Sequence, residues 1–160
     1  MRRRALFAMA LCAALIGSAA AVTAEVDPFV GTWVLDRQQS RYEADAVPER
    51  MVIVMTATAQ GVHYRSDARY AEGRSAVSEY TAEYDGVLAM VLGSAGILAP
   101  VSLKRIDANT VEASYFLGLR VVASARRVVS REGRALTITT TSRDAAGQSR
   151  TNVAVFERAL

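Results

Sequence analysis

Apolar and polar side chains alternate along several short β-rich segments, and this pattern limits the folds open to the chain. In residues 62–70, Val62, Tyr64 and Ser66 share one parity, while His63 and Arg65 share the other. Successive side chains of a strand point to opposite faces of a sheet, so the pattern predicts strands with one buried and one solvated face. The same alternation recurs in residues 75–84, 110–116 and 134–142.

Turn signals such as Gln60-Gly61 and Asp85-Gly86 separate these segments, and no apolar stripe at helical spacing follows residue 24. Short strands between regular turn signals predict an antiparallel meander. The predicted strands cover residues 29–36, 49–57, 62–70, 75–84, 87–91, 101–106, 110–116, 120–130, 134–142 and 150–158. Residues 37–48 are polar and predicted to be irregular, and residues 93–100 form a small-residue loop. A meander of this length removes its exposed edges by closing, so we expect an all-β, up-and-down barrel of about eight to ten strands.

The first 24 residues have the layout of a signal peptide. Arg2, Arg3 and Arg4 precede an apolar run over residues 5–16, and small residues lead to Ala24. The run is too short to span a bilayer comfortably. We therefore expect cleavage near Ala24, a single domain over residues 25–160 with no membrane span, and a periplasmic or secreted location.

Charge and cysteine content narrow the chemistry of the exported domain. The chain has 19 Lys and Arg against 16 Asp and Glu, and the three arginines of the leader account for the difference. A domain without net charge gives no reason to expect a nucleic-acid partner. The single cysteine, Cys12, lies in the leader, so no disulfide is expected. Leu11 stands where a lipoprotein signal has a small residue, which argues against acylation at Cys12.

Catalytic and metal-binding patterns are missing from the sequence. Residues 25–160 contain no cysteine and one histidine, His63, which falls on the charged parity of its strand. A nucleophile or general base needs a partner within hydrogen-bond reach, and no such constellation stands out. No cluster has metal-ligand spacing. We therefore expect no catalytic residue, no metal and no cofactor, and a protein that is not an enzyme.

Gly31 and Trp33 form a G-x-W motif on the first predicted strand. In this the chain resembles the calycin superfamily, which includes lipocalins and intracellular fatty-acid-binding proteins. A longer similarity, to small exported bacterial lipocalin-like proteins without an agreed activity, covers DPFVGTW at 27–33, YTAEYDG at 80–86, LKRIDANTVEA at 103–113 and RVVS at 127–130. The resemblance implies a calycin-like barrel and a late arginine, here Arg158, packed on Trp33.

The resemblance does not extend to a fatty-acid site. The second lipocalin motif, of the T-D-Y type, is missing. The R-x-Y carboxylate clamp of fatty-acid-binding proteins is also missing, because the corresponding segment near the C-terminus reads Phe156-Glu157-Arg158. Residues 37–48 are too few for the helical lid of those proteins. The identity of a ligand therefore does not follow from the resemblance.

The inward tyrosines and one arginine are the candidate ligand-binding residues. Tyrosines alternating with Ser and Ala on a buried face leave an internal space and supply polar hydroxyls within it. Arg127 shares the buried parity of Ala123 and Ala125, where a charge needs a partner or an anion. The candidate set is Tyr64, Tyr80, Tyr84, Tyr115 and Arg127.

Two hypotheses remain open at this point. In the first, the barrel carries a small, partly apolar or anionic ligand, and Arg127 anchors its anionic group. In the second, the barrel is filled and acts as a structural or protein-binding module, an inhibitor for example, with an envelope protein as partner. Arg127 would then reach solvent or pair with a carboxylate. An exposed apolar patch would favour the second, and residues 51–55, apolar on both parities, are the expected place for it.

Overall fold

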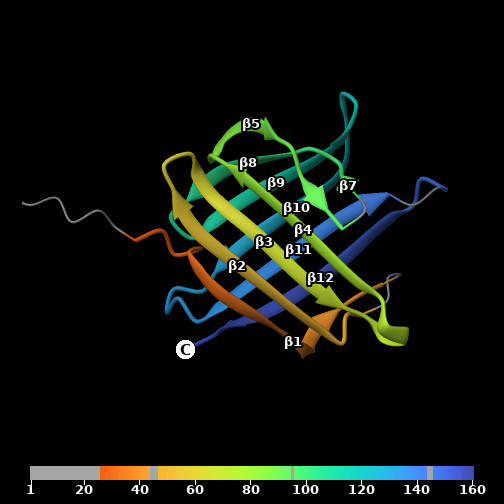
Figure 1. Cartoon of the computed structure of the whole chain (residues 1–160), viewed down its shortest axis with the longest axis horizontal. Helices are drawn as coiled ribbons and strands as arrows, with labels where there is room; N and C mark the ends of the chain where they lie inside the picture. Colours follow the sequence, from red (N-terminus) through yellow and green to blue (C-terminus); the bar gives the residue numbers. More distant parts are fainter. Residues whose placement is uncertain (1–25, 44–46, 95, 144–145) are drawn as a thin grey trace, which may run out of the picture.

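The computed structural model describes residues 26–43, 47–94, 96–143 and 146–160 (Figure 1). The predicted signal peptide lies outside the described residues. Strands dominate the rest of the chain, and they are β1 (Gly31–Arg41), β2 (Arg50–Thr58), β3 (Gly61–Arg69), β4 (Ser75–Ala82), β5 (Asp85–Ala89), β6 (Leu92–Gly93), β7 (Gly96–Ile97), β8 (Val101–Asp107), β9 (Thr110–Leu117), β10 (Arg120–Val129), β11 (Ala135–Arg143) and β12 (Ser149–Arg158). The one helix among the described residues is a 3-10 turn, η1 (Ala71–Gly73), so no helix in this part of the chain could span a membrane.

The strands form one antiparallel sheet in the order β5-β8-β9-β10-β11-β12-β1-β2-β3-β4-β6-β7. β4 stands near one edge of this sheet and β5 forms the other edge, yet only Glu83 and Tyr84 separate them in sequence. The backbone N–H of Arg105, in β8, donates to the carbonyl of Tyr84 at 3.3 Å. The chain therefore curls the sheet until its two edges meet, as a calycin-like barrel requires (Figure 1).

The predicted all-β meander is confirmed, with three local differences. β1 continues to Arg41, through residues predicted to be irregular, and its pairing with β12 shifts register between Asp36 and Arg41. The shift lets polar residues stay in the sheet, because a bulge re-aims the side chains that follow it. The loop predicted over residues 93–100 contains the last residue of the very short strand β6 and all of the very short strand β7. Tyr70 lies just beyond the end of β3.

The inward side chains of the strands form the hydrophobic core, and Trp33 lies within it. Trp33 is fully buried, and its indole N–H donates to the carbonyl of Phe29 at 2.9 Å. Leu35 and Phe156 are paired neighbours on β1 and β12, and both are buried. Buried aromatic side chains therefore lie where residues 27–33 enter the barrel.

Candidate functional site

Arg127 is the one charged side chain that the described residues bury, with 3% of its surface exposed. It lies on β10 between Ala125 and Val129, which are also buried, as the alternation predicts. Its Nη1 donates to the hydroxyl of Tyr80 at 2.6 Å, and its Nη2 donates to the hydroxyl of Tyr115 at 3.0 Å. β4, β9 and β10 therefore converge on one cation inside the barrel.

Aromatic faces complete the surroundings of this cation. The rings of Tyr64 and Tyr80 stack with their centroids 4.8 Å apart. The Arg127 Cζ atom lies 5.0 Å from the Tyr64 centroid and 5.9 Å from the Tyr80 centroid. The negative face of an aromatic ring attracts a cation at this range. Cross-strand pairing holds the stack, because Tyr64 and Tyr80 are directly opposite in β3 and β4.

No carboxylate within the described residues forms an ion pair with Arg127. The Nε atom of Arg127 is buried and has no hydrogen-bond partner there. A buried cation without a counter-ion costs much more than one paired with an anion. The alternative of an arginine paired with a carboxylate is therefore not what the structure shows, and the site has unused capacity for a negative group.

The environment fixes the charge states of the site. Burial raises the pKa of the Tyr64 and Tyr80 hydroxyls, so both stay neutral and can accept hydrogen bonds. Burial alone would lower the pKa of Arg127, but the phenol oxygens of Tyr80, Tyr115 and Tyr64 outweigh this effect and hold the pKa well above its ordinary value. The site is thus a permanent cation beside the neutral phenols of Tyr64 and Tyr80.

A hollow of about 230 Å³ adjoins Arg127. Its lining residues come from β2, β3, β9, β10, β11 and β12 and from the segments that follow β1 and β3. They are Tyr42, Pro48, Met51, Tyr64, Tyr70, Tyr115, Arg127, Ile138, Thr140, Asn152, Ala154 and Phe156. Most of this wall is apolar or aromatic, so the charge of Arg127 stands beside an apolar space.

The structure brings together four of the five predicted binding residues. Tyr64, Tyr115 and Arg127 line the hollow, and Tyr80 bonds Arg127 behind it. Tyr84 is placed elsewhere: the Arg105 Cζ atom lies 4.0 Å from its ring centroid, and Arg105 Nη2 donates to Asp27 Oδ2 at 2.7 Å. Tyr84 follows the end of β4, so alternation along that strand does not fix its direction.

Several lining residues were not among the predicted site residues. Tyr42 lies in the segment predicted to be irregular, and Tyr70 follows the end of β3. Met51 and Thr140 do lie on strands, on the same parity as Ile53 and Ile138, so alternation alone could have placed them. On the outward parity of residues 51–55, where an apolar patch was expected, Val54 is exposed and Val52 is half-buried. The exposed Val34 of β1 pairs with Val52, so a small apolar surface is present there.

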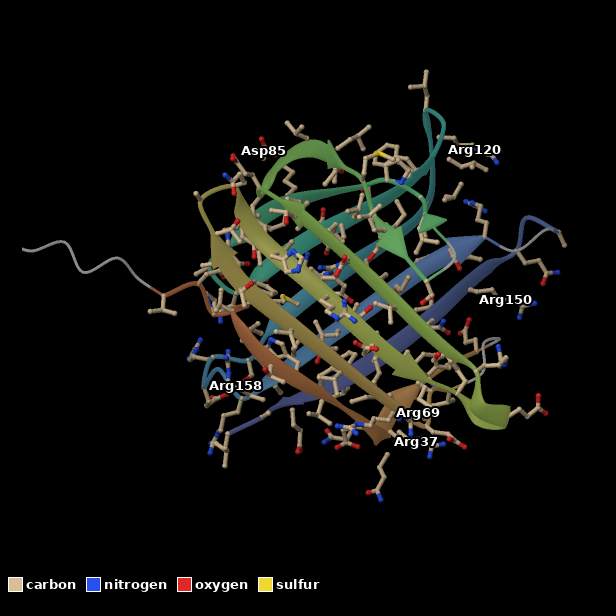
Figure 2. All side chains as sticks on the ribbon, viewed as in Figure 1. Arg37, Arg69, Asp85, Arg120, Arg150 and Arg158 are labelled. Carbon is tan, nitrogen blue, oxygen red and sulfur yellow. The ribbon has the colours of Figure 1, made fainter. Side chains whose placement is uncertain are left out.

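Gly31, Trp33 and Arg158 form a separate, structural cluster. The Arg158 guanidinium lies 4.1 Å from the Trp33 ring centroid. It donates to the carbonyls of Gly133, Val30 and Pro28 at 2.5, 2.7 and 2.6 Å. Arg158 therefore donates its hydrogen bonds to backbone carbonyls and covers Trp33. Figure 2 shows it at the end of the barrel opposite Arg120.

A second hollow, of about 710 Å³, lies where β10 begins and β11 ends. Its lining residues are Arg120, Val121, Val122, Ala123, Ser124, Thr141, Ser142, Arg143, Gly147 and Ser149. It is larger than the hollow at Arg127, but it contains no buried charge. No group of three or more His, Cys, Asp or Glu residues that could hold a metal occurs in the described part of the chain.

Known structures share this fold. The ileal bile-acid-binding protein of zebrafish, in complex with cholic acid, superposes with a TM-score of 0.54 at 11% identity, over 82% of this chain and 99% of that chain. Rv2717c from M. tuberculosis is 16% identical over 83% of this chain and 94% of that one, with a TM-score of 0.49. No protein-family model and no curated protein sequence matches the chain. The calycin-like fold is thereby supported, while the similarity to exported lipocalin-like proteins stays a prediction.

Proposed function

We propose that this protein binds a small apolar molecule bearing a carboxylate or similar anion in the hollow beside Arg127. The observation that carries the proposal is the buried guanidinium, whose donated bonds go to phenols and whose Nε atom has no partner among the described residues. An incoming anion would neutralise the charge at a position where water contributes little screening. Support from the fold is general: the zebrafish protein that shares it was crystallised with cholic acid.

The volume of the hollow limits the ligand. In liquid water each molecule occupies about 30 Å³. At that density the hollow of about 230 Å³ holds roughly eight non-hydrogen atoms. A compact aromatic or short-chain acid matches this space, and a larger molecule would extend out of the hollow.

The experiment is native mass spectrometry of the protein purified from its own source, in wild-type and Arg127→Met forms. Met keeps most of the volume of the arginine stem and removes the charge. We expect a small acidic adduct on the wild-type protein that is absent from the folded variant. The same adduct on both proteins would reject Arg127 as its anchor.

We also propose that the protein acts outside the cytoplasm, as a carrier and without catalysis. The proposal depends on residues 1–24, with their three arginines, apolar run and Ala24. N-terminal sequencing of exported protein should give a start near Glu25. A chain that retains Arg2 to Arg4 in the cell would contradict export.

A further inference from the structure

Exposed apolar side chains gather at one end of the barrel, at the connection of β9 to β10 and in the segment before β8. Leu119 is 100% exposed at the tip of the β9–β10 hairpin, and Leu117 is 67% exposed beside it. Met90, Leu92, Leu98 and Val121 are also exposed. The two segments are neighbours, because the backbone N–H of Phe116 donates to the carbonyl of Pro100 at 2.9 Å. Figure 1 shows β7 close to this hairpin.

The hairpin tip is built to present these leucines. Leu117 and Arg120 are paired, so Gly118 and Leu119 alone form the connection. Gly118 has φ +60°, a conformation that glycine adopts without strain at the first position of such a two-residue loop. The next residue is then directed away from the sheet. An apolar side chain fully in water at a defined tip marks a contact surface more often than scattered surface leucines do.

Positive charges outnumber negative ones at this end. Arg120, Arg143 and Arg150 stand against Glu43, whose Oε2 accepts a hydrogen bond from the backbone N–H of Thr151 at 2.7 Å, and Asp144, which follows Arg143 in the sequence. Residues 86–103 contain no charged residue at all, and residues 113–125 contain only Arg120. Arg143 and Arg150 stand on the neighbouring β11–β12 hairpin, and Ser142, which pairs with Arg150, also pairs with Ala123. Figure 2 shows Arg120 and Arg150 at the same end of the barrel. None of the acidic residues that the structure describes lies in residues 86–103, 113–125 or 146–150.

We propose that this end of the barrel docks on an anionic lipid surface, with Leu117 and Leu119 inserted at the interface and Arg120 and Arg143 over the headgroups. Apolar side chains flanked by cations are the combination that binds a bilayer surface carrying negative charge. A second copy of the chain would bring the same cations together, which charge repulsion opposes. An anionic lipid surface accommodates both the exposed apolar side chains and the cations beside them.

The docking surface lies beside the larger of the two hollows. The hollow of about 710 Å³ lies at this end and is lined by Ala123 of β10, while the hollow of about 230 Å³ is lined by Arg127 of the same strand. A molecule that leaves a bilayer at Leu119 would meet the larger hollow first. Lipid docking does not depend on ligand binding, however, and each is tested separately.

The test is co-sedimentation of the folded domain with vesicles of phosphatidylcholine alone or of phosphatidylcholine mixed with phosphatidylglycerol. We expect binding to the mixed vesicles only. Leu119→Ser should weaken that binding about tenfold, because one leucine no longer leaves water. Arg120→Glu should weaken it by at least about fivefold, because an attraction becomes a repulsion.

Matched controls lie at the opposite end of the barrel. Ile106→Ser removes a side chain that is exposed near the β8–β9 turn, and Arg131→Glu reverses an exposed charge between β10 and β11. Both should bind the mixed vesicles as the wild type does. The proposal is overturned if the wild-type domain stays in solution, if it binds neutral vesicles equally well, or if Ile106→Ser weakens binding as much as Leu119→Ser. Self-association through Leu119 without vesicle binding would replace the lipid by a second copy.

Discussion

The guanidinium of Arg127 and the hydroxyl of Tyr80 meet inside the barrel, where Nη1 donates to the phenol oxygen at 2.6 Å. Arg127 is 3% exposed and Tyr80 is 5% exposed. They come from β10 and β4, which are not adjacent in the sheet, so the bond crosses the interior. This bond and the stack of Tyr80 on Tyr64 hold the cation in one orientation beside the hollow.

Arg127→Met should leave the fold intact and the melting temperature unchanged or higher. The substitution removes a buried charge that has no ionic partner among the described residues, and relief of such a charge is stabilising. It also leaves the hydroxyls of Tyr80 and Tyr115 without their donor, which offsets part of the gain. Thermal melts of the ligand-free proteins measure the effect. A clearly lower melting temperature would mean that the charge stabilises the empty barrel.

Tyr80→Phe should lower the free energy of unfolding by about 1–3 kcal/mol, because it leaves a buried donor of Arg127 without its acceptor. The cost should nearly vanish when Tyr80→Phe is made in the Arg127→Met background, where no donor remains to be satisfied. Urea unfolding of the four proteins gives the coupling energy. Equal costs in both backgrounds would show that the hydrogen bond between Arg127 and Tyr80 does not contribute to stability.

Stability should fall at alkaline pH. Burial raises the folded-state pKa of Tyr64 and Tyr80 above the ordinary value of 10.0. Their contribution is therefore complete below about pH 10, where the unfolded chain also keeps the protons, and it is lost as the pH rises above that value toward the folded-state pKa. Urea unfolding across this range should show a shallower decline for Tyr64→Phe than for the wild type. Parallel curves would refute the assignment.

Gly31→Ala should destabilise the fold more than Gly86→Ala does. Both glycines have positive φ, +144° and +86°, so both substitutions strain the backbone by about 1–3 kcal/mol. A Cβ at position 31 would also collide with Nη1 of Arg158, while a Cβ at position 86 meets open space. Chemical denaturation of the two variants measures the difference. Equal losses would show that Arg158 moves aside without cost.

Alternation and turn spacing were enough to predict the meander and the burial of Arg127, because both depend on the two-residue period of a strand. The same rule could not place Tyr84, which lies between strands, or Tyr42, which follows the bulge in β1. The neighbours of Arg127 come from sheet curvature, which decides that β4 faces β10 across the interior. Local sequence does not show which strands will face each other across the barrel. The exposed apolar end was likewise missed, because parity does not show where a hairpin tip protrudes.

The most direct test of the site is a calorimetric titration with benzoate and with benzamide, which have nearly the same size and differ in charge. The account predicts that benzoate binds the wild-type protein roughly ten- to a hundredfold more tightly than benzamide, as a hydrogen bond to a charged group allows. In Arg127→Met this preference should disappear. Equal binding of the two compounds to the wild type, or a preference for benzoate that survives in Arg127→Met, would contradict an anion site at Arg127.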